Sequence, residues 1–205
     1  MLRSSPRILV ALALILGTAG CSSTKVVNRW ENPQYVPAHF NRILVIGVSR
    51  EASVRRVFED AFVGRLKAEG VHATPSYVLI PEEGQVDESR LQQATRQANA
   101  DGVLMTRLVR VERKTEVTSG YYSPPPAPLG QYPWYSDRSL GYYEPPVVYQ
   151  YDVYISETSL YDVRTNQLVW SGTVQTNTAG DLNKEIQRYV ATVIKALKKG
   201  NVLAT

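Results

Sequence analysis

The residues of this chain that could carry out chemistry are few. The 205 residues include one cysteine, Cys21, and two histidines, His39 and His72. A metal site needs several Cys, His or acidic ligands at short spacing, and neither histidine has a second histidine or a cysteine at such a spacing. Glycine-rich phosphate loops and the G-x-S-x-G turn of serine hydrolases are also absent. The sequence therefore predicts no catalytic residues, no metal and no cofactor.

Two charged pairs are the remaining candidates for a polar site. Glu59 and Asp60 are adjacent in sequence, and adjacent residues of a helix do not face each other. We therefore interpret this acidic pair as part of a solvated helix face. Arg55 and Arg56 are interpreted as surface charge too, with a contact to anionic lipid or to a partner as the alternative.

The first twenty residues have the three-part build of a secretory signal peptide. Arg3 and Arg7 give a positive start, Ile8 to Leu16 form an apolar run of nine residues, and small residues follow. A permanent membrane helix needs about 20 apolar residues, so this run is too short. Cleavage of residues 1–20 takes two of the 23 basic residues and none of the 19 acidic ones. The mature net charge of about +2, with no basic stripe, is not that of a nucleic-acid-binding protein.

Cys21 directly follows the small residues of the signal. The stretch Gly17-Thr18-Ala19-Gly20-Cys21 resembles the lipobox of bacterial lipoproteins, with Thr18 in place of the usual Leu. The resemblance implies cleavage between Gly20 and Cys21, a diacylglyceryl group on the thiol, and an acyl chain such as palmitate on the new amino terminus. Each buried methylene contributes about 0.8 kcal/mol, so two or three chains anchor a protein firmly. The alternative is a plain secreted protein whose lone thiol lacks a disulfide partner.

Ser22 bears on which membrane holds the anchor. Inner-membrane lipoproteins usually carry Asp after the cysteine, so resemblance to this sorting rule implies the periplasmic side of the outer membrane of a Gram-negative cell. The expected partners are the membrane itself, through the acyl chains on Cys21, and an envelope protein or peptidoglycan. Nucleic acid is not expected in this compartment.

The mature chain is long enough for one domain, expected over residues 42–200. Residues 21–41 are expected to form a lipidated tether and an edge strand. Arg42 to Ser49 reads RILVIGVS, a nearly continuous apolar run typical of a strand covered on both faces. Ser49 is the expected cap of a first helix that ends at Gly70.

A second strand and a second helix follow in the predicted order. The strand is expected from Val71 to Ile80, the helix begins at a cap, Asp87, and Asp101-Gly102 turns into a third strand. Strand, helix, strand, helix, strand predicts parallel strands joined by right-handed crossovers.

The pattern then changes to an antiparallel hairpin. Two extended runs, Tyr149 to Tyr161 and Leu168 to Thr176, flank a turn. Leu168, Trp170 and Val174 are expected on one face, which makes Trp170 a core residue rather than a platform for a ligand.

A strongly amphipathic helix from Asp181 to Lys199 completes the domain. Its inward positions are Leu182, Ile186, Tyr189, Val190, Val193, Ile194 and Leu197. The predicted fold class is α/β (α+β), with a mixed sheet of about five strands and three helices packed on it.

Residues 119–149 differ in composition from the rest of the domain, with seven of the twelve prolines and seven of the thirteen tyrosines. This proline density excludes a helix and a central strand, and a connection of about 30 residues is unusually long. The long flanking strands place the segment at the tip of a hairpin arm. It is either a disordered excursion or a recognition surface, because Tyr and Trp are enriched at interfaces. The candidate interaction residues are Tyr121, Tyr122, Tyr132, Trp134, Tyr135, Tyr142 and Tyr143.

Three stretches together resemble a family of small uncharacterised proteobacterial outer-membrane lipoproteins. They are Trp30 to Pro33 followed by RILVIGVS, Arg55 to Phe62, and the hairpin Leu160 to Trp170. The order of elements is also similar to the anticodon-binding-like domain in the amino-terminal part of TolB, in the curli secretion lipoprotein and in activators of peptidoglycan synthases. The resemblance covers most of the mature chain outside residues 119–149 and implies no catalytic residues.

The sequence thus predicts a non-enzymatic, lipid-anchored accessory or assembly module of the cell envelope. Two alternatives remain open. One is a subunit of a homo-oligomeric secretion assembly, and the other is an envelope enzyme that acts on peptidoglycan.

Overall fold

The computed structural model describes residues 24–35, 39–80, 87–123, 142–178 and 181–203. The predicted cleavage, lipidation and sorting residues Gly20, Cys21 and Ser22 lie outside the described residues, as do Tyr132, Trp134 and Tyr135 of the predicted interaction set.

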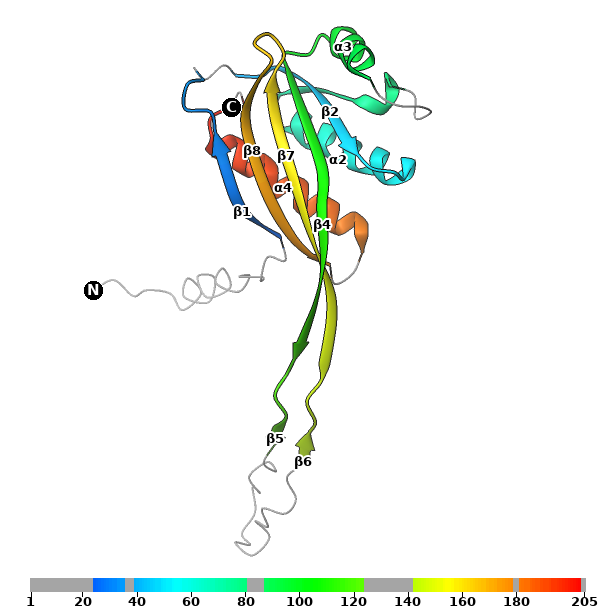
Figure 1. The fold of residues 1–205 in the computed structure, drawn as a ribbon, viewed down its shortest axis with the longest axis vertical. Helices are drawn as coiled ribbons and strands as arrows, with labels where there is room; N and C mark the ends of the chain where they lie inside the picture. Colours follow the sequence, from blue (N-terminus) through cyan, green and yellow to red (C-terminus); the bar gives the residue numbers. More distant parts are fainter. Residues whose placement is uncertain (1–23, 36–38, 81–86, 124–141, 179–180, 204–205) are drawn as a thin grey trace, which may run out of the picture.

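The described chain forms a mixed α+β fold, which confirms the predicted class (Figure 1). The strands are β1 (Thr24–Glu31), β2 (Arg42–Val48), β3 (His72–Pro75), β4 (Gly102–Val117), β5 (Tyr121–Ser123), β6 (Tyr142–Glu144), β7 (Val148–Asp162) and β8 (Gln167–Thr178). The helices are α2 (Ala52–Ala68), the short 3-10 turn η1 (Ser76–Val78), α3 (Glu88–Gln97) and α4 (Leu182–Lys199).

Six strands form one sheet in the order β1-β8-β7-β4-β2-β3. β2 is parallel to β3 and β4, as the predicted crossovers require, whereas β1, β8, β7 and β4 pair antiparallel. Helices α2 and α4 cover one face, where Phe62 and Ile194 pack against Trp170 in the main core. α3 lies on the other face, where Ala94 packs with Leu44. The strand β2 is therefore covered on both sides, which explains its continuous apolar run.

The helix ends follow the sequence signals with one exception. The Asp87 carboxylate accepts a hydrogen bond from the backbone N–H of Arg90 at 2.8 Å, so Asp87 caps α3 as predicted. Gly70 has φ +83°, a left-handed value that suits glycine, just after α2. Ser49, however, is not the cap of α2. That helix begins after Glu51, and the Ser49 hydroxyl accepts from the Glu51 N–H within the preceding loop.

The second strand is shorter than predicted. β3 ends at Pro75 and η1 follows, so the run from Val71 to Ile80 is not one strand. Proline has no N–H with which to continue a ladder, and the next residue, Ser76, turns its side chain into a buried polar cluster under α2.

The β7–β8 hairpin confirms Trp170 as a core residue with no exposed surface. Asn166 takes φ +56° in its turn. A register shift pairs Leu160 with Trp170 and Tyr161 with Leu168. The extra residue moves Leu168 off the face of Trp170, so the predicted common face holds for Val174 and not for Leu168.

Helix α4 is also close to its prediction. Its positions Ile186, Tyr189, Val190, Val193, Ile194 and Leu197 are buried. Leu182 is exposed instead, because it is the first residue of the helix and lies at the end of the sheet. Of the described helices, none is long and apolar enough to span a membrane.

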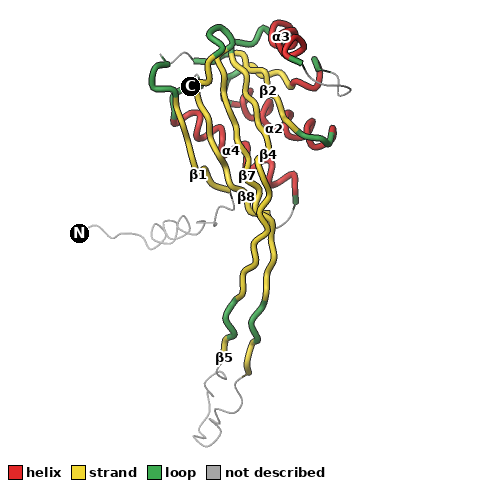
Figure 2. The backbone as a smooth tube through the Cα atoms, viewed as in Figure 1, coloured by secondary structure: helices red, strands yellow, loops and turns green. Residues whose placement is uncertain are grey.

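Strands β4 and β7 continue well beyond the sheet as a two-stranded ribbon (Figure 2). The last pair between β7 and β8 joins Asp152 to Thr178. Past this point the ribbon holds residues 114–123 and 142–151, including the small β5–β6 ladder, and we call these residues the arm. No third strand of the described chain pairs with the arm.

Candidate interaction site

The arm exposes an unusual number of apolar side chains. Val117 is 62% exposed and Val148, its partner across the ribbon, is 59% exposed. The other exposed apolar residues of the arm are Tyr121, Tyr122, Tyr143, Val147 and Tyr149. None of them belongs to either hydrophobic core. A cluster of exposed apolar residues with no folding role marks an interaction surface.

Charged pairs lie at the base of the ribbon, nearer the sheet. Arg107 bonds Glu157 at 2.7 Å and Arg113 bonds Asp152 at 3.0 Å, each across the two strands. The described arm carries three charged residues, Lys114, Glu116 and Glu144. The ribbon therefore changes along its length from ion-paired to mainly apolar.

The structure brings part of the predicted interaction set together. Tyr122 and Tyr143 are direct cross-strand partners, Tyr121 pairs with Glu144, and Tyr142 pairs with Ser123. The side chains of Tyr121, Tyr122 and Tyr143 are exposed. These positions belong to a hairpin arm, as the long flanking strands predicted.

A cavity of about 190 Å³ lies at the base of the arm, between the sheet and the first turns of α2 and α4. Its apolar lining includes Phe58, Leu108 and Ile186. The charged residues in its wall are paired: Arg55 bonds Glu59 at 2.9 Å, and Glu185 bonds Arg188 at 2.8 Å. The cavity therefore has a mainly apolar and electrically balanced wall.

Three hydroxyls are linked by hydrogen bonds at the wall of this cavity, where Thr106 and Tyr189 are lining residues. The Thr158 hydroxyl is 2.7 Å from the Thr106 hydroxyl and 2.6 Å from the Tyr189 hydroxyl, and either atom of each pair could be the donor. Burial between α4 and the sheet raises the pKa of Tyr189 to about 12, although the hydrogen bond with Thr158 acts in the opposite direction. The phenol is therefore neutral at ordinary pH and serves as a polar contact between helix and sheet.

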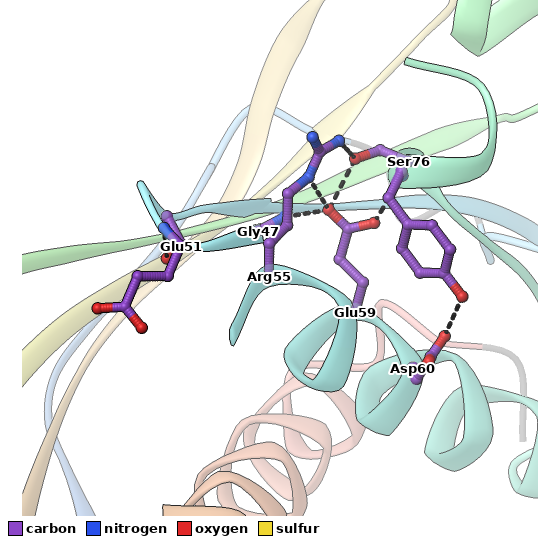
Figure 3. Close-up of polar contacts among 8 residues, drawn as sticks. Gly47, Glu51, Arg55, Glu59, Asp60 and Ser76 are labelled. Atoms are coloured by element: carbon purple, nitrogen blue, oxygen red, sulfur yellow. Dashed lines mark hydrogen bonds and ion pairs between the residues drawn. The ribbon is translucent and has the colours of Figure 1, made fainter. Parts of the chain in front are cut away.

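Glu59 forms a buried polar cluster behind the cavity wall (Figure 3). Its Oε1 accepts from the Gly47 N–H, the Arg55 Nε and the Ser76 hydroxyl at 2.9, 2.9 and 2.7 Å, and its Oε2 accepts from the Tyr77 N–H at 3.0 Å. Arg55 also donates to the Ser76 hydroxyl at 2.7 Å. These bonds connect α2 to the end of β2 and to η1. The Glu59 carboxylate therefore holds the backbone of Gly47 and Tyr77 in place.

The prediction that the charged pairs are surface features is therefore wrong for one member of each. Glu59 has no exposed surface and the Arg55 side chain is only 11% exposed. Asp60 and Arg56 do lie at the surface, where Asp60 accepts a 2.8 Å hydrogen bond from the Tyr77 hydroxyl. The spacing of Arg55 and Glu59 by four residues was the available signal, since such residues are neighbours on a helix.

A second buried carboxylate belongs to the β7–β8 turn. Asp162 accepts from the Tyr35 hydroxyl at 2.6 Å and from the N–H groups of Arg164 and Thr165. Burial alone would raise the pKa of Asp162, but these hydrogen bonds outweigh it and hold the pKa below its usual value. Burial and the bond to Asp162 raise the pKa of Tyr35 to about 12. The cluster joins the segment after β1 to the hairpin turn.

Metal binding has no support in the described ranges, where no group of three or more His, Cys, Asp or Glu residues is placed to hold an ion. The features with an interaction character are the apolar arm and the cavity at its base. Together they define a mixed α+β domain that carries a projecting two-stranded arm.

Comparison with known proteins does not assign this domain to a family. No family model matches the chain, and no curated protein matches it. Similar solved structures include the PelC dodecamer from Paraburkholderia phytofirmans, 16% identical over 89% of this chain and 99% of that one, with a TM-score of 0.47. Lipoprotein GNA1162 from Neisseria meningitidis is 12% identical over 77% of this chain and 97% of that one, with a TM-score of 0.41.

Proposed function

We propose that this chain is a non-enzymatic, lipid-anchored protein on the periplasmic side of the bacterial outer membrane, and that its arm binds another envelope protein. The anchor is the predicted lipidated Cys21. The arm is the accessory or assembly surface. The observation that carries the proposal is the group of exposed Val and Tyr side chains on a ribbon with which no third described strand pairs.

A two-stranded ribbon lacks the stabilisation that further strands give a sheet. An isolated two-stranded hairpin is marginally stable in water, and free strand edges are ready templates for pairing with another strand. An extended segment of a partner protein can add to either edge through backbone hydrogen bonds, while its side chains contact the exposed Val and Tyr residues. A protein partner satisfies both features, whereas a sugar polymer would use the tyrosine rings alone.

The test is site-specific photo-crosslinking of the full chain in intact cells. A photoreactive amino acid replaces Val117 or Val148 in the arm. Val78 serves as the control because it is similarly exposed, at 57%, but lies outside the arm in η1, directly after the edge strand β3. We expect one defined protein adduct from the two arm positions and none from Val78.

Three other results would overturn the proposal in different ways. Absence of adducts from the arm would mean that the arm binds no protein. Adducts only to a second copy of the chain would favour the homo-oligomeric assembly. Equal adducts from Val78 would show that the capture is nonspecific.

A further inference from the structure

The cavity at the base of the arm lies at the end of the domain where the described chain begins. β1 starts at the end of the sheet from which the arm leaves (Figure 1). Its first residue, Thr24, is the direct cross-strand partner of Thr176, and Thr176 lines the cavity. Direct partners in an antiparallel pair point to the same face of the sheet. The chain therefore enters the domain beside the cavity and on its side of the sheet.

Thr176 supplies an independent indication of an occupant. Its side chain is 6% exposed, and its hydroxyl has no hydrogen-bond partner among the described residues. Buried hydroxyls are rarely left unpaired, because they lose their bonds to water. Arg55 and Glu185 in the lining are ion-paired, and the hydroxyls of Thr106 and Tyr189 are hydrogen-bonded to Thr158. The lining also holds Ser49, Tyr154 and Ser156, and its remaining side chains are apolar. The cavity thus suits a ligand with an apolar body and one hydrogen-bond acceptor.

An acyl chain joined through an ester or amide carbonyl has these properties. Cys21 is three residues before Thr24, and three extended residues span at most about 11 Å. We propose that one acyl chain of the lipidated Cys21 lies in this cavity, with its carbonyl oxygen accepting a hydrogen bond from Thr176. This inference rests on the lipidation in the proposed function.

The volume of the cavity determines how much of the acyl chain fits into it. An apolar cavity of about 150 Å³ accommodates benzene, so the cavity here, at about 190 Å³, holds a short length of one chain. The remaining length and the other chains stay in the bilayer. An acyl chain held in the cavity fixes the orientation of the domain relative to its lipid anchor. The arm then projects in one direction from the end of the domain that faces the membrane.

The test uses the full chain, expressed in cells that receive a photoreactive fatty acid. After illumination, mass spectrometry locates crosslinks between the Cys21 peptide and the rest of the protein. We expect an intramolecular crosslink to a peptide of α2, β4 or α4 that lines the cavity.

Two neighbouring positions give a matched pair of variants. Leu108 and Val109 are 49% and 44% exposed, and only Leu108 lines the cavity. Leu108→Glu should lower the crosslink yield at least tenfold, whereas Val109→Glu should leave it unchanged. The thermal transition of both variants reports whether the domain is folded.

The crosslinking result for the unsubstituted protein tests the inference even if neither variant folds. A labelled Cys21 without an intramolecular crosslink would overturn the inference and leave the lipid anchor standing. A cavity peptide that carries a whole phospholipid would assign the cavity to a membrane lipid instead. An unlabelled protein would remove both the inference and the anchor.

Discussion

Glu59 illustrates how a single buried charge can organise several elements. Its carboxylate is removed from water, and four donors from β2, α2 and η1 replace the lost hydration. The Arg55 guanidinium balances the charge at 2.9 Å. A buried pair of this kind adds little net stability compared with an apolar pair, but removal of one member leaves the other uncompensated.

The first prediction follows from that asymmetry. Glu59→Ala should lower the free energy of unfolding by about 3 to 5 kcal/mol, because Arg55 and the N–H of Gly47 lose their acceptor. Urea denaturation measures the loss. Asp60→Ala is the control, since the neighbouring carboxylate is exposed and its contact with Tyr77 contributes much less. Equal losses for both variants would contradict the structural role given to Glu59.

A pH dependence at the alkaline end is the second prediction. Tyr189 has its pKa raised from 10.0 to about 12. A group whose folded pKa is raised contributes stability that is present below its unfolded pKa and is lost as pH rises toward its folded pKa. Two pKa units correspond to about 2 to 3 kcal/mol, so the free energy of unfolding should fall between pH 10 and 12.

Tyr189→Phe separates this effect from the titration of other groups. The variant loses the hydrogen bond with Thr158 at every pH, but it should show a shallower decline between pH 10 and 12. Urea denaturation at a series of pH values checks the slope. Identical slopes for the two proteins would mean that Tyr189 titrates normally.

At the scale of elements, the β4–β7 ribbon belongs to two environments. Near the sheet its side chains meet α4 and β8, as Leu160 does against Trp170. Past the Asp152 pair, toward the tip, no third strand of the described chain pairs with it. The cores are complete without the arm, so the stability of the domain and the presence of the arm should be separable.

Shortening the arm tests this separation. Replacement of residues 119–146 by Asn-Gly joins Thr118 to Val147, whose backbones already share a 2.9 Å hydrogen bond, and Asn-Gly suits a two-residue hairpin turn. The thermal midpoint should stay within a few degrees of the original, because no core residue is removed and a shorter loop costs less entropy to close. Adducts from a photoreactive residue at Val117 should disappear. Unfolding of the variant would show that the arm stabilises the domain.

The elements themselves were largely predictable because local signals were strong. β2 matches its apolar run within one residue, and α2 ends just before Gly70 as expected. Trp170 was recognisable as core from its strand pattern. The register shift that displaces Leu168 was not, because a bulge depends on the partner strand.

The candidate sites were less predictable, since they depend on contacts between distant residues. Glu59 meets Gly47 and Ser76, which are 12 and 17 residues away. The cavity is formed by residues from β2, α2, β4, β7, β8 and α4. No local sequence pattern in any of these segments predicts it. The arm is the exception, because much of it belongs to residues 119–149, whose proline and tyrosine content differs from that of the rest of the sequence.

At the scale of the whole molecule, the place where the chain enters the domain determines how far the arm lies from the membrane anchor. Thr24 lies at the end of the sheet from which the arm projects. If the anchor is at Cys21, the arm is close to the membrane and a change of membrane would change the partners it can reach. Ser22→Asp should shift the mature protein toward the inner membrane in a Gram-negative host. Membrane fractionation checks the shift, and an unchanged distribution would show that Ser22 is not the sorting residue.

The anchor itself is the last prediction. Cys21→Ala removes the thiol that would carry the diacylglyceryl group, so the variant should remain unprocessed at the Gly20-Cys21 bond and should not be labelled by a fatty-acid analogue. Cys21 is the single cysteine of the chain, so loss of label cannot come from another thiol. Ser23→Ala, two residues further on, is the control and should be processed and labelled normally. Normal labelling of Cys21→Ala would refute the lipid anchor, and with it the acyl occupant of the cavity, while the fold and the arm would be unaffected.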